Sequence, residues 1–283
     1  MRIYMQCCCF LMITANTHSD PGSMAEVLMD ERKVFSVEIA GVPMEIRCKY
    51  AKNRAFFSDY FTDKAPLFSI EPQIEDLDRI RRSFNRTAAA ENRPNTDYPL
   101  WFLENNAIHE LIAESIASEN VLLMHGSCIA MDGKAFLFTA PSGTGKSTHT
   151  RLWREVFGDR CFMVNDDKPM LRFENGKITA CGTPWTGKHG LGQNTSVPLY
   201  AIIKLERAEE NSIEPITKQE AFEVVFRQAY TSRNAETMRK ILFLEQQLMD
   251  NVRFFSFGCN MDKEAAVIAW NGLNNETGSS NND

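Results

Sequence analysis

The chain has 283 residues, of which 43% are hydrophobic and 24% are charged, and its formal net charge is −6. A chain of this length can bury one large core or two modest ones, and its acidic balance argues against a nucleic-acid-binding protein, which usually presents a basic face. The eight cysteines include three in a row at 7–9, and the rest form no CxxC pair. The cysteine spacing therefore predicts neither a zinc site nor a disulfide framework, and it fits a reducing cytoplasm.

The first 23 residues carry a short apolar run followed by the loop-like stretch NTHSDPGS. The run is too short to span a bilayer, and no clear small-residue cleavage pattern follows it. We therefore expect residues 1–23 to be a disordered extension of a cytoplasmic protein that has no membrane partner. The polar tail at 274–283 is also expected to be disordered, because it offers little apolar surface to bury.

Residues 24–100 are expected to form a small β-rich module. Apolar and polar residues alternate on both sides of AGVP in the segment 33–50, which is typical of a β-hairpin. Residues 71–99 are charged and contain three prolines. We expect a connector or an exposed loop there and place the domain boundary at its end.

A second domain over residues 101–273 is expected to bind a nucleotide. Its first helix is predicted at 103–118, where apolar residues fall on one face, and a hairpin follows over 120–140 with its turn at Asp132 and Gly133. This hairpin leads straight into a glycine-rich loop. A dinucleotide-binding fold reaches its phosphate loop from a parallel strand, so the antiparallel approach predicts a mixed, largely antiparallel α/β sheet instead.

The remaining elements alternate between helices and strands. We expect, in chain order, a helix to about residue 157, a strand at 161–166, a hairpin around 174–176, a strand at 200–207, two amphipathic helices between 222 and 248, a short strand at 253–257 and a last helix through Trp270. The sequence shows no internal repeat.

The segment FLFTAPSGTGKSTHT, at 136–150, combines an apolar strand, a small-residue loop and the start of a helix. Glycines let backbone N–H groups approach the phosphates of a nucleotide, a helix N-terminus favours an anion, Lys146 adds a full charge and the Ser147 hydroxyl can ligate Mg²⁺. Ala140 stands where the strict pattern has glycine, and alanine is also small. The predicted phosphate-binding residues are Ser142, Gly143, Thr144, Gly145, Lys146, Ser147 and Thr148.

Asp166 and Asp167 end the strand that begins near residue 161. Carboxylates at the end of a strand beside a phosphate loop can hold Mg²⁺ or accept the proton of an attacking hydroxyl, so two adjacent aspartates can divide both duties. The alternative is an exposed turn, because NDDKP has a turn-forming composition. The neighbouring loop favours the functional interpretation.

The segments MHGSCIAMDGKAFLFTAPSGTGKST and VNDD together resemble the C-terminal domain of HPr kinases, within the phosphoenolpyruvate-carboxykinase-like group of P-loop folds. In that family a histidine in an HG pair lies one strand-hairpin before the loop, and a DD pair follows the next strand. His125 and the pair Asp166 and Asp167 stand in those places. The resemblance covers residues 120–207 and implies transfer of a phosphate from ATP to a hydroxyl.

The resemblance also implies individual catalytic roles. Asp166 would be the general base, with His125 tuning or orienting it, while Ser147 and Asp167 would hold Mg²⁺. Lys146 would neutralise charge on the phosphates. HPr kinases assemble into oligomers, so a homo-oligomer is implied as well.

One family feature is missing. HPr kinases carry a later arginine- and proline-rich signature, and CGTPWTGKHGLGQNTSVPL stands in its place at 181–199. HPr is therefore not the expected acceptor. Glycines and polar residues dominate at 183–196, so we expect this loop to close over the nucleotide or substrate, with Lys188 as a second phosphate contact; the alternative is a solvated surface loop. His149, just inside the helix after the glycine loop, is expected at the surface.

The leading hypothesis is an ATP- and Mg²⁺-dependent kinase acting on a serine- or threonine-like hydroxyl of a peptide, protein or small molecule. A decarboxylating carboxykinase needs a second metal site and arginines for a dicarboxylate, and the sequence around the loop offers no such cluster. A non-catalytic nucleotide-sensing module is the third hypothesis. The DD pair argues against it, because sensing requires no general base. No NKxD-like guanine motif occurs, which favours ATP over GTP.

Overall fold

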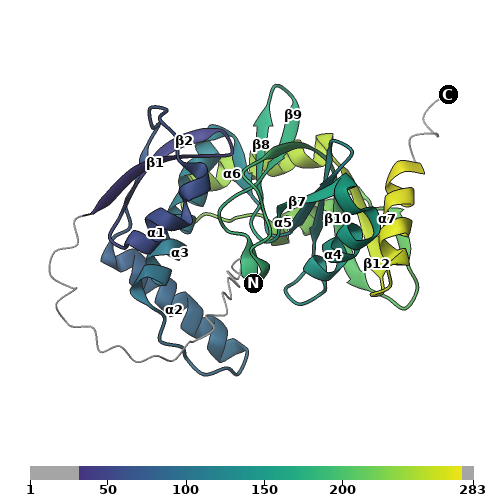
Figure 1. Ribbon diagram of the computed structural model, residues 1–283, viewed down its shortest axis with the longest axis horizontal. Coiled ribbons are helices and arrows are strands. Elements are labelled where there is room, and N and C mark those ends of the chain that lie inside the picture. The colour runs from purple at the N-terminus through teal and green to yellow at the C-terminus, as the bar shows by residue number, and fades with distance from the viewer. Residues whose placement is uncertain (1–31, 276–283) are drawn as a thin grey trace. The chain divides into compact units, whose positions relative to one another are not determined.

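The structure is a computed structural model, and it describes residues 32–275 of the chain (Figure 1). The extension expected at 1–23 lies outside the described residues, as does most of the expected polar tail. The chain divides into two compact units between Glu119 and Asn120. The predicted boundary at residue 100 is wrong, because the helix that begins there packs within the first unit.

The first unit begins with the predicted hairpin. β1 (Lys33–Ile39) pairs antiparallel with β2 (Val42–Cys48), and alternate residues of β2 are buried. The turn uses Ala40 and Gly41 at φ of 51° and 75°, the positive values that a two-residue hairpin turn favours. The short β3 (Ser69–Ile70) adds a parallel partner to β2.

Helices make up much of the first unit, so the expected β-rich module is an α+β unit instead. Its helices are α1 (Ala51–Phe56), α2 (Ile74–Ala90) and α3 (Leu100–Ile116), with 3₁₀ turns at Ser58–Tyr60 and Ala117–Glu119. α2 occupies most of the segment that was expected to be a connector. It packs against α3 through a cluster that joins Leu77 and Ile80 to Leu103 and Ala107.

The second unit is built on a nine-stranded sheet. Its strands are β4 (Val121–Leu123), β5 (Ser127–Met131), β6 (Lys134–Thr139), β7 (Cys161–Asn165), β8 (Met170–Glu174), β9 (Lys177–Cys181), β10 (Ser196–Arg207), β11 (Ser212–Pro215) and β12 (Arg253–Cys259). They lie in the order β4-β8-β9-β10-β6-β5-β7, with β12 beside β10 and β11 beside β12. β10 runs parallel to β6 and β12, and the other pairs are antiparallel. The predicted mixed, largely antiparallel α/β sheet is confirmed.

The long strand β10 joins two parts of this sheet. Its first three residues pair with β9, and the residues from Leu199 onward pair with β6, with a register shift between Leu199 and Ala201. An irregularity of this kind bends a strand and increases its twist. The sheet therefore curls at β10, and the far end of β10 runs beside the end of β6.

The helices of the second unit pack against the sheet. They are α4 (Lys146–Phe157), α5 (Lys218–Gln228), α6 (Ala235–Asn251) and α7 (Glu264–Asn275), with 3₁₀ turns at Gly158–Arg160 and Gly187–His189. α4 and α7 pack side by side (Figure 1). The core beneath them contains the fully buried Trp153, whose ring lies 5.3 Å from that of Phe136 on β6. Truncating such a ring typically costs about 3–5 kcal/mol, so β6 and α4 are firmly fixed on either side of the glycine loop.

Candidate functional site

The glycine-rich loop joins the end of β6 at Thr139 to the start of α4 at Lys146. Gly143 and Gly145 have φ of +80° and +126°, and apart from the adjacent residues of the chain no atom of the described residues lies within 4 Å of the point where a Cβ would stand on either. These conformations favour glycine, and the open space leaves the backbone accessible to a ligand. The loop thus presents bare peptide groups at a helix N-terminus, an arrangement suited to an anion.

Lys146 places its positive charge on this loop. Its ammonium donates hydrogen bonds to the carbonyl oxygens of Ala140 (2.9 Å) and Pro141 (3.4 Å). The other predicted phosphate-binding residues of the loop and of the first turn of α4 are each exposed or partly buried: Ser142, Gly143, Thr144, Gly145, Ser147 and Thr148. The structure therefore gathers all of the predicted phosphate contacts except Lys188 in one short segment that a ligand can reach.

Arg207, the last residue of β10, is a second cation on the loop. Its Nη2 donates to the carbonyl oxygen of Gly143 at 2.6 Å, and its Nε donates to that of Thr144 at 3.2 Å. The sequence analysis missed this residue, because the contact spans more than sixty residues and no local pattern marks it. The side chains of Lys146 and Arg207 thus both donate hydrogen bonds to carbonyl oxygens of the loop.

Asp166 follows β7 and faces the start of α4. Its carboxylate accepts a hydrogen bond from the Ser127 hydroxyl at 2.5 Å, and the Ser147 hydroxyl is a second partner. Asp166 is only 7% exposed, and burial raises the pKa of its carboxyl group despite the two hydroxyls, which act in the opposite direction. A carboxylate beside a hydroxyl supplies hard oxygen donors of the kind that Mg²⁺ prefers.

Asp167 has a different set of partners. Its Oδ1 lies 2.9 Å from Nζ of Lys168 and 3.6 Å from Nε2 of His125. Lys168 is completely buried, so its contact with Asp167 is an ion pair in the protein interior. The two aspartates lie in a bend just after β7, where the side-chain oxygen of Asn165 accepts hydrogen bonds from the backbone N–H groups of Asp167 and Lys168.

The structure therefore pairs the predicted catalytic residues differently from our expectation. We expected His125 to orient Asp166, and Ser147 to share a metal ion with Asp167. Instead His125 lies against Asp167, and Ser147 lies against Asp166. The two aspartates therefore have different partners: Asp166 contacts the first turn of α4, and Asp167 contacts Lys168 and His125.

Gln228, the last residue of α5, fixes the orientation of His125. Its Oε1 lies 3.1 Å from Nδ1 of the ring, and its backbone carbonyl accepts from the backbone N–H of His125 at 2.8 Å. Gln228 therefore fixes the plane of the ring, with Nε2 directed towards Asp167. Burial, followed by the charges of Lys168 and Lys146, holds the pKa of His125 well below its usual range.

The glycine-rich segment 183–196 packs against the end of β7 near Thr183 and Gly192, whereas residues 188–190 in its middle are exposed. Thr183 is buried, and Asn165 donates from Nδ2 to both oxygens of Thr183 at 3.0 Å. Glycine is required at position 182, since a Cβ there would lie 1.8 Å from the carbonyl oxygen of Gln193. Gly182 and Gly192 therefore permit close packing beside the acidic pair, and closure of the segment over a ligand stays a prediction.

Two further predictions concern basic side chains near this site, Lys188 and His149. Lys188 and His189 both lie exposed in the 3₁₀ turn of the segment. The charge of His189 lowers the pKa of Asp166, a smaller effect than burial, whereas the phosphate contact of Lys188 stays a prediction. His149 is buried and not at the surface: its Nε2 accepts a hydrogen bond from Nε1 of Trp153 at 2.9 Å.

The described side chains do not form a complete metal-binding site by themselves. Within residues 32–275, no group of three or more His, Cys, Asp or Glu side chains is placed to hold a metal ion. Mg²⁺ commonly takes one or two carboxylates and completes its shell with phosphate oxygens and water. Asp166 and Ser147 fit that pattern.

Comparison with known proteins gives a family. A family model described as "SynChlorMet cassette protein ScmC" matches residues 91–271, more than half of the chain. The chain belongs to this family. No curated protein matches it. Among solved structures, the HPr(Ser) kinase/phosphatase from Coxiella burnetii is similar over 55% of this chain and 99% of its own, at 14% identity and a TM-score of 0.33. A TM-score of this size supports no inference about a shared fold or activity.

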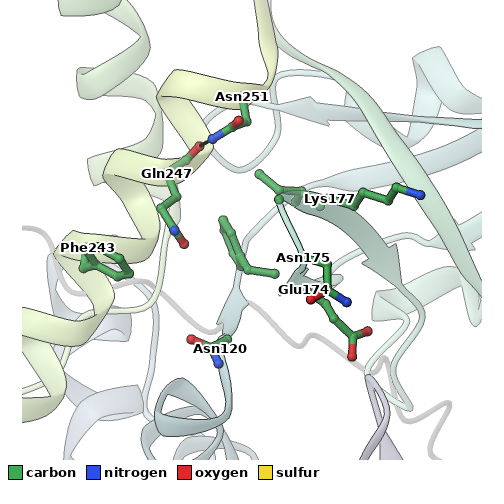
Figure 2. A pocket seen from close by; sticks show the side chains of 10 residues that line it. Asn120, Glu174, Asn175, Lys177, Phe243, Gln247 and Asn251 are labelled. Atoms are coloured by element: carbon green, nitrogen blue, oxygen red, sulfur yellow. Dashed lines mark hydrogen bonds between the residues drawn. The ribbon is translucent and has the colours of Figure 1, made fainter.

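This ScmC-family chain also contains an open cavity of about 240 Å³ between the β8–β9 hairpin and α6 (Figure 2). It is lined by Asn120, Phe173, Glu174, Asn175, Gly176, Lys177, Ile178, Phe243, Gln247 and Asn251. Figure 2 shows the side-chain amide of Gln247 turned towards its interior. Of the described residues, those predicted for the phosphate site do not line this cavity, so it is separate from the candidate site.

No helix within the described part of the ScmC-family chain has both the length and the apolar character needed to cross a membrane.

Proposed function

We propose that this chain is an ATP-dependent phosphotransferase that moves the γ-phosphate to a hydroxyl of a peptide, a protein or a small molecule. The observation that carries the proposal is the contact between the Ser147 hydroxyl and Asp166, which joins the first turn of α4 to the acidic pair. Two buried carboxylates repel a phosphate, so they disfavour a loop that merely binds an anion. With Mg²⁺ present, the same carboxylates become favourable partners of the nucleotide.

The loop residues would bind the nucleotide phosphates. Backbone N–H groups around Gly143 and Gly145 are accessible on the open side of the loop, and the N-terminus of α4 adds a favourable field. Lys146 would exchange its hydrogen bonds to the carbonyls of Ala140 and Pro141 for contacts with phosphate oxygens. Its ammonium is already at the loop, so this exchange needs only side-chain rotation.

The contacts favour a division of roles opposite to the one implied by the family resemblance. Asp166 and Ser147 would hold Mg²⁺, which when bound neutralises charge on the phosphates. Asp167 would accept the proton of the attacking hydroxyl, whose oxygen forms the new bond to the γ-phosphorus as ADP leaves. His125 lies beside this carboxylate and would hold it in position to accept the proton.

The experiment is transfer of label from γ-labelled ATP to acceptors in an extract of the source cells, with and without Mg²⁺. We expect Lys146→Met to weaken ATP binding, and Asp166→Asn to abolish the strengthening of ATP binding by Mg²⁺. Asp167→Asn should bind ATP with Mg²⁺ normally but transfer label about a hundredfold more slowly or worse, the usual cost of losing a general base. Asp159→Asn, on an exposed 3₁₀ turn, is the matched control.

The same experiment distinguishes the phosphotransferase from a nucleotide-sensing module and tests which aspartate is the general base. ATP binding that depends on Lys146, with no label transferred to any acceptor, would reject the phosphotransferase and favour a nucleotide-sensing module. Failure of the wild-type chain to bind ATP would reject both. Equal transfer by wild type and Asp167→Asn, with Asp166→Asn inactive but still responding to Mg²⁺, would restore Asp166 as the general base.

A further inference from the structure

The backbone of Arg207 is anchored in the sheet at the level of the glycine loop. Lys204 of β10 pairs with Thr139, the last residue of β6, so β10 continues past the end of β6 to Arg207. Three residues of strand span about 10 Å. On its other side this extension stays paired with β12, where Arg207 lies opposite Cys259. The long side chain of Arg207 therefore starts from a fixed base beside the loop.

The guanidinium group binds the loop from the side of its carbonyl groups. Nη2 and Nε donate to two successive carbonyls, those of Gly143 and Thr144. In a loop whose N–H groups converge on an anion, the carbonyls point away from that anion. Arg207 can therefore keep its contacts when a phosphate binds, whereas Lys146 holds carbonyls that it must release to reach the phosphate.

We infer that Arg207 is a positioning residue that holds the glycine loop in its phosphate-binding shape, both before and after the nucleotide binds. The inference rests on the proposed function for the identity of the ligand. A planar guanidinium can form both bonds at once, and a lysine ammonium on a flexible stem cannot reproduce this geometry. Because the Arg207 side chain is exposed, its loss should affect the shape of the loop and not the folding of the second unit.

Hydrogen exchange in the full chain without nucleotide tests the shape of the loop directly. The backbone N–H of Thr144 donates to the carbonyl of Pro141 at 3.3 Å, so its exchange reports opening of the loop. We expect Arg207→Gln to speed this exchange about tenfold, as loss of two charge-assisted bonds at an exposed site predicts. Arg207→Lys should have a smaller effect. Arg151→Gln, an exposed position on α4 paired with Glu155, is the control and should change nothing in the loop.

Nucleotide affinity gives the second readout. Arg207→Gln should weaken ATP binding about tenfold, whereas Arg151→Gln should bind ATP as the wild type does. Exchange and affinity both within twofold of the wild type would overturn the inference, as would faster exchange spread over the whole second unit. If the wild-type chain binds no ATP, the proposed function fails, and the exchange comparison alone still decides whether Arg207 holds the loop.

Discussion

Replacing Lys168 by methionine should destabilise the second unit strongly. The substitution keeps the length of the side chain and removes its charge, which leaves Asp167 buried without its ion-pair partner. At the observed separation of 2.9 Å, and with an effective dielectric constant of about 20, the lost attraction is ~6 kcal/mol. Part of it was already offset by the lost hydration of both groups, so we expect the free energy of unfolding to fall by about 3–5 kcal/mol.

Urea unfolding at pH 7, followed by near-ultraviolet circular dichroism, measures this loss. The double variant Lys168→Met and Asp167→Asn removes both charges together, so it should recover most of the stability, as neutral replacements of buried ion pairs commonly do. Lys177→Met, at the exposed β8–β9 turn, should change stability by less than about 0.5 kcal/mol. A loss below about 1 kcal/mol in Lys168→Met, or a double variant no more stable than the single one, would refute a buried ion pair at this position.

Three other predictions concern individual residues. Burial lowers the pKa of His149 to about 3. Below pH 6.5 the unfolded chain therefore binds a proton at this histidine that the native state does not bind. The free energy of unfolding should fall by about 1 kcal/mol per pH unit from 6.5 downwards. His149→Gln should flatten this slope in urea unfolding at pH 7, 6 and 5, and parallel curves would contradict the assignment. Gly182→Ala should cost about 2 kcal/mol or more, because its Cβ would strike the carbonyl of Gln193; an unchanged unfolding midpoint would disprove the close approach. Asp166→Asn should abolish the Mg²⁺ dependence of ATP affinity measured by calorimetry, and an intact dependence would exclude Asp166 as a metal ligand.

The helix α2 shows why the first unit was misjudged from its sequence. Pro72, Pro94 and Pro99 suggested a broken segment, but all of them lie outside α2, and Pro99 is the N-cap of α3. Proline is compatible with both ends of a helix, so it marks boundaries as well as loops. Asp76 caps the start of α2 by accepting a hydrogen bond from the backbone N–H of Gln73, but Gln followed by Asp is not the usual sequence signature of a capping box.

The second unit was more predictable because its strands alternate with clear turns and helical faces. The sequence left two interpretations open for the glycine-rich segment at 183–196, since a glycine that permits close packing looks the same in sequence as one in a flexible loop. His149 was misplaced although Trp153 stands four residues later on the same helical face. That spacing was the available signal that the ring is buried.

The composition of the candidate site was accessible from sequence, but its internal pairings were not. The glycine loop, Lys146 and the two aspartates follow a local order that implies a phosphate site. Which aspartate faces Ser147 depends on the directions of side chains at the end of β7, and the contact of Arg207 depends on how far β10 runs past β6. Such relations arise only when distant strands pair.

The central claim is that this chain transfers a phosphate with Asp167 as the proton acceptor. The most direct measurement is a single-turnover assay of label transfer from γ-labelled ATP with Mg²⁺, comparing the wild type with Asp167→Asn. The account predicts that the wild type labels a discrete acceptor while the variant binds ATP equally well and transfers label about a hundredfold more slowly. Transfer at the same rate by both proteins would contradict the assigned role of Asp167, and ATP binding without any transfer by the wild type would contradict the claim itself.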